Sequence, residues 1–144
     1  MTINDYLHHA VVATEYLDHY GHVNHAHYLT LFENARWGYY HLKNITAESI
    51  KEGGIGPVVL KAEISYKKEV LGGEKITIRS EHLGYRHGLW HLKQVLIKEN
   101  GKIGAVVTLV FGLFDLQQRK LIAPFGQWLE GPLEDIVDGP QTEA

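Results

Sequence analysis

The sequence contains no cysteine, so disulfides, thiolate metal sites and a cysteine nucleophile are excluded. No apolar run approaches the roughly 20 residues that a membrane-spanning helix needs. The first residues do not combine a charged start with an apolar stretch, so no signal peptide is expected. The net charge is −3, and no basic stripe indicates nucleic-acid binding. A soluble, cytoplasmic protein without a membrane or nucleic-acid partner is therefore expected.

A length of 144 residues with 44% apolar content is typical of one globular domain. Acidic residues, glycine and proline dominate the end of the chain, which has no basic residue after position 130. We therefore expect a single domain over residues 1–130 and an acidic, partly mobile tail over 131–144.

The first half of the chain predicts one strand followed by one long helix. Residues 10–17 resemble a strand, and residues 25–43 have a helical period that starts after Asn24, a good N-cap residue. The residues 52–57, EGGIGP, break the helical pattern. The expected apolar stripe of the helix consists of Leu29, Phe32, Ala35, Tyr39 and Leu42.

The second half predicts antiparallel strands. Apolar and polar residues alternate over 60–67 and 75–79, and another strand is expected over 89–99. Asn100-Gly101 is a strong two-residue hairpin signal before a segment, 102–116, that is apolar on both faces and should be central or face another subunit. The predicted class is α+β, with a curved antiparallel sheet of five to six strands wrapped around one long central helix.

Histidine is unusually abundant, and four of the ten histidines lie in residues 18–29. Histidine is a common metal ligand, and His19, His22 and His25 are spaced by three. However, Gly21 and the Asn24 cap place the first two in a loop, unlike the helical H-E-x-x-H arrangement. No metal site is predicted, and a polar turn is the plain interpretation of most of these histidines.

A catalytic interpretation of the same stretch depends on the helix start. If Asn24 accepts the amide of Ala26 or His27, the amide of His25 stays free at the positive end of the helix. Such an amide can stabilise an oxyanion. Asp18 lies seven residues earlier and could act there as nucleophile or general base. A loop aspartate in an Asx turn is the alternative interpretation.

Residues 18–36 follow the pattern DxxGHVNHAxYxxxFExAR. This pattern resembles the signature of the 4-hydroxybenzoyl-CoA thioesterase family of hotdog-fold acyl-CoA thioesterases. A strand that ends in Ile64-Ser65-Tyr66, a Gly-Gly-Glu turn at 72–74 and the Asn-Gly hairpin agree in order and spacing. The resemblance covers roughly residues 8–125.

The resemblance implies an enzyme that hydrolyses an acyl-CoA to a free acid and coenzyme A, with an acyl carrier protein as an alternative carrier. It implies that Asp18 is the catalytic carboxylate and that the amide of His25 binds the thioester oxygen. The His25 side chain matches a histidine thought to assist catalysis in one bacterial branch. Asn24 would fix the helix start, and Tyr28 and Tyr66 would line the acyl pocket.

The family also pairs its sheets edge to edge, so a homodimer or homotetramer with active sites between subunits is expected. No cofactor is expected beyond the coenzyme A of the substrate. Arg86 and His87, in a glycine-flanked loop, could meet the phosphates of coenzyme A. Glu69 stands where many relatives have proline, a departure expected to affect strand geometry alone.

Three alternatives remain open at this point. Glu33 is a rival catalytic carboxylate, because some hotdog thioesterases use a helix glutamate, although an ion pair with Arg36 three residues later is more economical. The hotdog fold also supports hydratases and dehydratases, which release no thiol. A non-catalytic module that binds acyl-CoA or an acyl carrier protein would show affinity without turnover.

Overall fold

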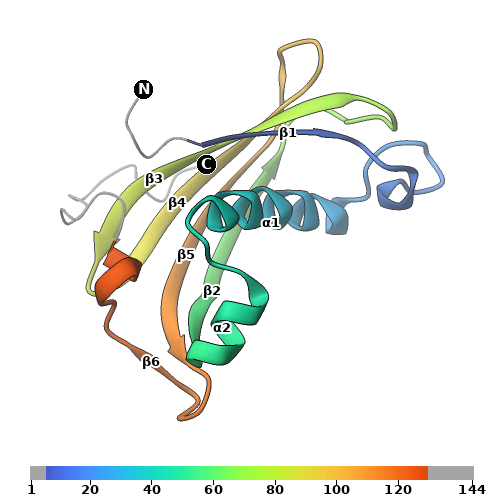
Figure 1. The fold of residues 1–144 in the computed structure, drawn as a ribbon. Coiled ribbons are helices and arrows are strands. Elements are labelled where there is room, and N and C mark those ends of the chain that lie inside the picture. Colours follow the sequence, from blue (N-terminus) through green and yellow to red (C-terminus); the bar gives the residue numbers. More distant parts are fainter. Residues whose placement is uncertain (1–5, 130–144) are drawn as a thin grey trace.

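The computed structural model describes residues 6–129, without the side chains of Tyr85, Gln127 and Leu129. The predicted tail, 131–144, lies outside the described residues. One antiparallel sheet curves around a long helix, α1, as Figure 1 shows. The sheet order is β1-β3-β4-β5-β2, and β6 pairs with β5. The strands are β1 (Tyr6–Val11), β2 (Ile55–Tyr66), β3 (Lys75–Arg86), β4 (Leu89–Ile97), β5 (Ile103–Asp115) and β6 (Lys120–Ile122).

The predicted α+β hotdog architecture is confirmed. Helix α1 spans His25–Leu42, close to the predicted 25–43, and a second helix, α2, spans Ala47–Gly53. Single 3-10 turns cover Thr14–Tyr16 and Gly126–Leu129. Within the described part of the chain, no helix is long and apolar enough to cross a bilayer.

The buried face of α1 differs from the predicted stripe. Phe32 and Ala35 are fully buried as predicted, but Leu29 and Leu42 are 41% and 69% exposed. The sequence carries two overlapping apolar stripes, and the sheet covers the one with positions i, i+3, i+4 and i+7. The residues buried on this face are Tyr28, Leu31, Phe32 and Ala35.

The predicted first strand, 10–17, is wrong in its position. The strand β1 ends at Val11, opposite Lys75, the first residue of β3. Val12 still bonds to the residues just before β3, through its amide to the Glu74 carbonyl and its carbonyl to the Gly73 amide, each at 3.0 Å. The chain then leaves the sheet and turns at Thr14–Tyr16. The pairing of β1 is set by a strand far along the sequence, which a local pattern does not report.

Sequence reasoning also missed α2. Thr46 is its N-cap, and the side chains of Thr46 and Ser49 form a reciprocal capping box. Gly54 ends the helix with φ +73°, a left-handed conformation that favours glycine. The predicted breaker at 52–57 is therefore correct, but it ends a short helix.

The strand β5 lies inside the sheet, which is one of the two predicted alternatives. It pairs with β4 on one side and with β2 on the other, which explains its apolar residues on both faces. The predicted interruption at 84–88 is shorter in the structure: residues 84–86 belong to β3, after a register shift between His82 and Gly84, and only His87 and Gly88, both with positive φ, form the turn to β4.

A buried polar network joins α1 to the sheet. The Gln94 side chain, on β4, is fully buried and donates to the Phe32 carbonyl at 3.1 Å and to Ser80 Oγ at 3.0 Å. Its Oε1 accepts from Arg36 Nη1 at 3.0 Å. Burial lowers the pKa of Arg36. The expected Glu33–Arg36 ion pair is not formed, and Glu33 accepts instead from Trp37 Nε1 at 3.2 Å.

Tyr40, on α1, gives the fold an expected sensitivity to alkali. Burial raises its pKa to about 12, against 10.0 for an unperturbed tyrosine. The contribution of Tyr40 to the free energy of unfolding is complete below pH 10. It is lost as the pH rises toward 12, because the Tyr40 phenol ionises at a lower pH in the unfolded chain than in the folded protein. We therefore expect the free energy of unfolding of the wild type to fall by about 2–3 kcal/mol relative to that of Tyr40→Phe over this window. Urea unfolding of both proteins at pH 8 and pH 11.5 measures the difference; parallel losses would contradict the assignment.

Candidate active site

Asp18 sits in a tight loop whose base is closed by backbone contacts. Leu17 and Val23 form an antiparallel bridge, and the Asp18 amide donates to the His22 carbonyl at 3.0 Å. Gly21, with φ +85°, allows the chain to reverse. Asp18 Oδ1 accepts from the Tyr20 amide at 2.9 Å, so the Asx turn is present.

The predicted helix cap at Asn24 is confirmed. Its Oδ1 accepts from the Ala26 amide at 3.0 Å, and its carbonyl accepts from the His27 amide at 2.9 Å. The Asn24 amide itself donates to the Tyr16 carbonyl at 2.9 Å, which ties the helix start to the 3-10 turn. Among residues 6–129, no acceptor is found for the amide of His25. This N–H is available at the positive end of α1.

A pocket of about 260 Å³ opens beside this helix start. Tyr66 donates to the His25 carbonyl at 3.1 Å, and its ring meets the ring of Tyr28 edge-on, 5.1 Å away. Burial raises the pKa of Tyr28, so its phenol stays protonated through the physiological range. The pocket is lined by His22, Val23, His25, Tyr28, Tyr66, Lys67, Lys68 and Glu69.

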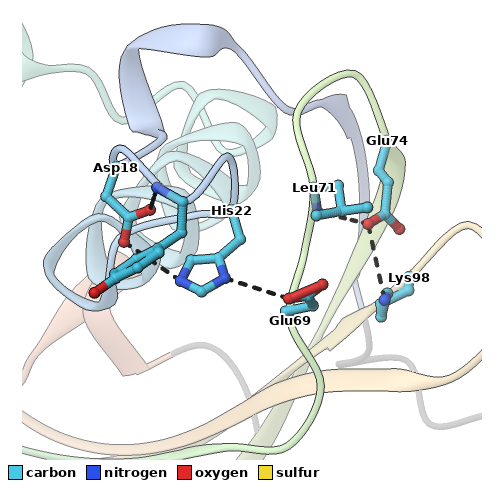
Figure 2. A network of polar contacts seen from close by, with 7 residues as sticks. Asp18, His22, Glu69, Leu71, Glu74 and Lys98 are labelled. Carbon is cyan, nitrogen blue, oxygen red and sulfur yellow. Dashed lines mark hydrogen bonds and ion pairs between the residues drawn. The ribbon is translucent and has the colours of Figure 1, made fainter.

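Asp18 is not among these lining residues, but it contacts one of them. His22 Nε2 lies 3.3 Å from Asp18 Oδ2, and His22 Nδ1 lies 3.3 Å from Glu69 Oε2 (Figure 2). Sequence reasoning gave no role to the His22 side chain or to the Glu69 carboxylate. The contact between Asp18 and His22 joins residues only four positions apart, so this short spacing was the one signal in the sequence. The contact between His22 and Glu69 joins distant parts of the chain, and no local pattern indicates it.

The other predicted site residues lie elsewhere in the chain. Glu33 lines a separate pocket of about 420 Å³ together with Arg36 and Tyr40. Arg86 is the last residue of the 12-residue strand β3, and His87 follows it, whereas the connection that leads into the first residue, Lys75, is bridged to the Asp18 loop through Leu71 and His22. At about 3.3 Å per residue the two ends are roughly 35 Å apart along the strand. One chain therefore does not bring Arg86 and His87 to Asp18.

The remaining histidines of the loop make ring contacts. The His19 ring lies 4.3 Å from that of Tyr20, and the His27 ring lies 5.6 Å from that of Tyr16. Residues 6–129 hold no cluster of three or more histidine or carboxylate side chains arranged for a metal ion.

Removing the cap should affect both stability and turnover. Asn24→Ala deletes the acceptor of the Ala26 amide, so we expect a loss of about 1 kcal/mol in the free energy of unfolding. If the His25 amide binds the substrate, as the family resemblance implies, kcat should also fall, because the capped first turn orients this amide. Thr46→Ala, which removes the cap of α2, should cost similar stability without a loss of kcat. Urea unfolding and assays of the activity that the resemblance implies provide the comparison for both variants; equal kcat values would contradict this role of Asn24.

One antiparallel sheet curved around a long helix is the hotdog fold, and the structure places a carboxylate loop and an open amide at the start of that helix. A family model of the thioesterase-like superfamily matches residues 12–133. The chain belongs to this superfamily.

Individual relatives agree with this assignment. The long-chain acyl-CoA thioesterase FadM of Escherichia coli is 32% identical over 126 residues, which cover 85% of this chain and 92% of FadM. The structure of the "probable thioesterase" YbaW from Escherichia coli has a TM-score of 0.72 at 29% identity, covering 86% of this chain and 93% of YbaW. A Staphylococcus aureus protein solved in complex with CoA shares the fold, with a TM-score of 0.80 at 18% identity, covering 98% of this chain and 93% of that protein.

Proposed function

We propose that this protein is an acyl-CoA thioesterase that hydrolyses an acyl-CoA to a free carboxylic acid and coenzyme A. The observation that carries the proposal is the free His25 amide beside the Asp18 loop. Support also comes from FadM, a long-chain acyl-CoA thioesterase, and from the related fold that was solved with CoA. Coenzyme A enters as part of the substrate, and the proposed chemistry needs no further cofactor.

In the proposed reaction, the thioester carbonyl lies against the His25 amide. As general base, Asp18 removes a proton from water, and the oxygen of that water adds to the carbonyl carbon. The His25 N–H stabilises the resulting oxyanion, helped by the helix dipole. The intermediate then expels the thiolate of coenzyme A, which takes the proton from Asp18. Direct attack by the Asp18 carboxylate, followed by hydrolysis of the anhydride, is the nucleophilic version.

His25 and the two tyrosines have supporting roles in this proposal. The His25 side chain lines the pocket and orients the substrate or transfers a proton. Tyr28 and Tyr66 form one wall beside the acyl group. Glu33 is the less favoured carboxylate, because it lines a different pocket in the same chain and already accepts from Trp37.

The proposed enzyme is a homodimer, or a homotetramer of two such dimers. β2 is an edge strand and exposes Val59, Leu60 and Tyr66, each close to half exposed. If two β2 strands paired antiparallel, the Tyr66 end of one would meet the Ile55 end of the other. The Arg86–His87 turn lies toward the Ile55 end of the sheet, so a second copy could place it near the Asp18 loop to bind the phosphates of coenzyme A.

Release of free thiol from a panel of acyl-CoAs tests the proposed activity, and matched acyl-carrier-protein thioesters test the carrier. We expect turnover of acyl-CoA with stoichiometric thiol. Hydration of an enoyl-CoA without thiol would favour a hydratase, and affinity without turnover would favour a binding module. Size-exclusion chromatography with light scattering tests the oligomer. The cytoplasmic location expected from the sequence stays a prediction.

A further inference from the structure

The imidazole of His22 lies between two carboxylates that come from different parts of the chain, as Figure 2 shows. Asp18 belongs to the same loop, whereas Glu69 lies in the connection between β2 and β3. The side chains of Asp18 and Glu69 are 16% and 61% exposed, with His22 between them at 33%. The three groups therefore run from a sheltered carboxylate to one that faces solvent.

Among residues 6–129, each oxygen of the Asp18 carboxylate has one polar contact. Oδ1 accepts from the Tyr20 backbone amide, and Oδ2 faces His22 Nε2. The backbone contact alone would leave the carboxylate free to swing about Oδ1. The contact with His22 therefore sets the direction of Oδ2.

The connection that carries Glu69 is itself held in place. The Glu74 carboxylate accepts from the Leu71 amide at 2.7 Å and pairs with Lys98 at 3.8 Å. One backbone bridge joins this connection to the Asp18 loop: His22 lies opposite Leu71, and the Val23 amide donates to the Val70 carbonyl at 2.8 Å. Glu69 thus starts from a fixed backbone next to His22.

The two contacts of the His22 ring use different nitrogens. Nδ1 faces Glu69 Oε2 and Nε2 faces Asp18 Oδ2, each at 3.3 Å. A carboxylate accepts hydrogen bonds only, so each contact draws one ring nitrogen toward one carboxylate. Glu69 therefore holds the ring in the orientation that presents Nε2 to Asp18.

We propose that His22 is a positioning residue that holds Asp18 Oδ2 toward the thioester, and that Glu69 holds His22. This inference rests on the proposed function, because it assigns the role through Asp18. His22 does not take part in bond making: it fixes the orientation of the group that does.

Two variants of His22 separate this role from simple packing. The amide nitrogen of asparagine reaches the place of Nδ1, and that of glutamine reaches the place of Nε2. His22→Asn should lose the contact with Asp18 and lower kcat about 10- to 100-fold with little change in KM, the effect of a misplaced catalytic group. His22→Gln keeps a donor for Asp18 and should recover most of the activity. His19→Asn, in the same loop, is the matched control and should leave kcat unchanged.

Double variants connect the effect to Asp18 and Glu69. In the Asp18→Asn background, His22→Asn should cause no further loss, because the group that it positions is gone. Glu69→Gln should lower kcat less than His22→Asn and add nothing to it, whereas Glu63→Gln, on β2, should have no effect.

Each outcome bears on one of the two proposals. Loss of activity in Asp18→Asn with full activity in His22→Asn would overturn the positioning role and leave the proposed function intact. Full activity in Asp18→Asn would overturn the catalytic assignment and the positioning role with it. Equal losses caused by His22→Asn in the wild-type and Asp18→Asn backgrounds would indicate a structural effect and also overturn the inference.

Discussion

Asp18→Asn is expected to lower kcat for acyl-CoA hydrolysis at least ~100-fold, since it removes the group that activates water or attacks the carbonyl. The amide oxygen of asparagine can still accept from the Tyr20 amide, so the Asx turn should persist. We therefore expect the loss in kcat without a comparable loss in the free energy of unfolding. Thiol release and urea unfolding of the same preparation measure both quantities.

Asp115 provides the matched control for this substitution. Its Oδ1 accepts from the amides of Gln117 and Gln118, each at 2.9 Å, so it caps a turn as Asp18 does. In the same chain, Asp115 ends β5 opposite Ile55, whereas Tyr66, which contacts the His25 carbonyl, lies at the other end of β2 opposite Ala105. Asp115→Asn should leave kcat near the wild-type value. If Asp18→Asn behaved in the same way, Asp18 would be a turn residue and the proposed mechanism would be wrong.

The helix start was predictable because its signals are local. The N-cap preference of Asn24 and the helical period that follows depend on neighbouring residues alone, and both agree with the structure. The Asn100-Gly101 hairpin also lies where it was predicted, between β4 and β5, although the pair Lys98 and Lys102 closes it, so its loop has three residues instead of the predicted two. The hotdog topology needed more than local signals, and the resemblance of residues 18–36 to a known family provided it.

Other features depend on contacts between distant residues. Leu29 has the apolar character expected of the core, yet the curvature of the sheet selects the neighbouring stripe of α1, with Tyr28 and Leu31. The contact between His22 and Glu69 spans 47 positions of the chain, so no spacing rule could indicate it. Glu69 was interpreted as a change in strand geometry, because a single sequence does not show which side chain faces it.

The buried network around Gln94 makes the fold sensitive to one substitution. In Gln94→Leu, the Arg36 guanidinium would lose its acceptor at 3.0 Å while remaining partly buried near the ring of Phe111. The Phe32 carbonyl and Ser80 Oγ, which the fully buried Gln94 amide contacts, would also lose their partner. Polar groups that lose a buried hydrogen-bond partner are costly, so we expect a loss of about 3 kcal/mol in the free energy of unfolding.

A double-mutant cycle with Arg36→Leu tests the cause. If the loss of the acceptor for Arg36 accounts for most of the destabilisation, the Gln94→Leu/Arg36→Leu double variant should be more stable than Gln94→Leu alone, because leucine needs no acceptor. Thermal unfolding should show the single variant melting roughly 10 °C below the wild type. All samples need the same protein concentration, since an oligomer gains apparent stability with concentration. Additive losses in the cycle would show that Gln94 stabilises the fold through Phe32 and Ser80 and that Arg36 does not depend on it.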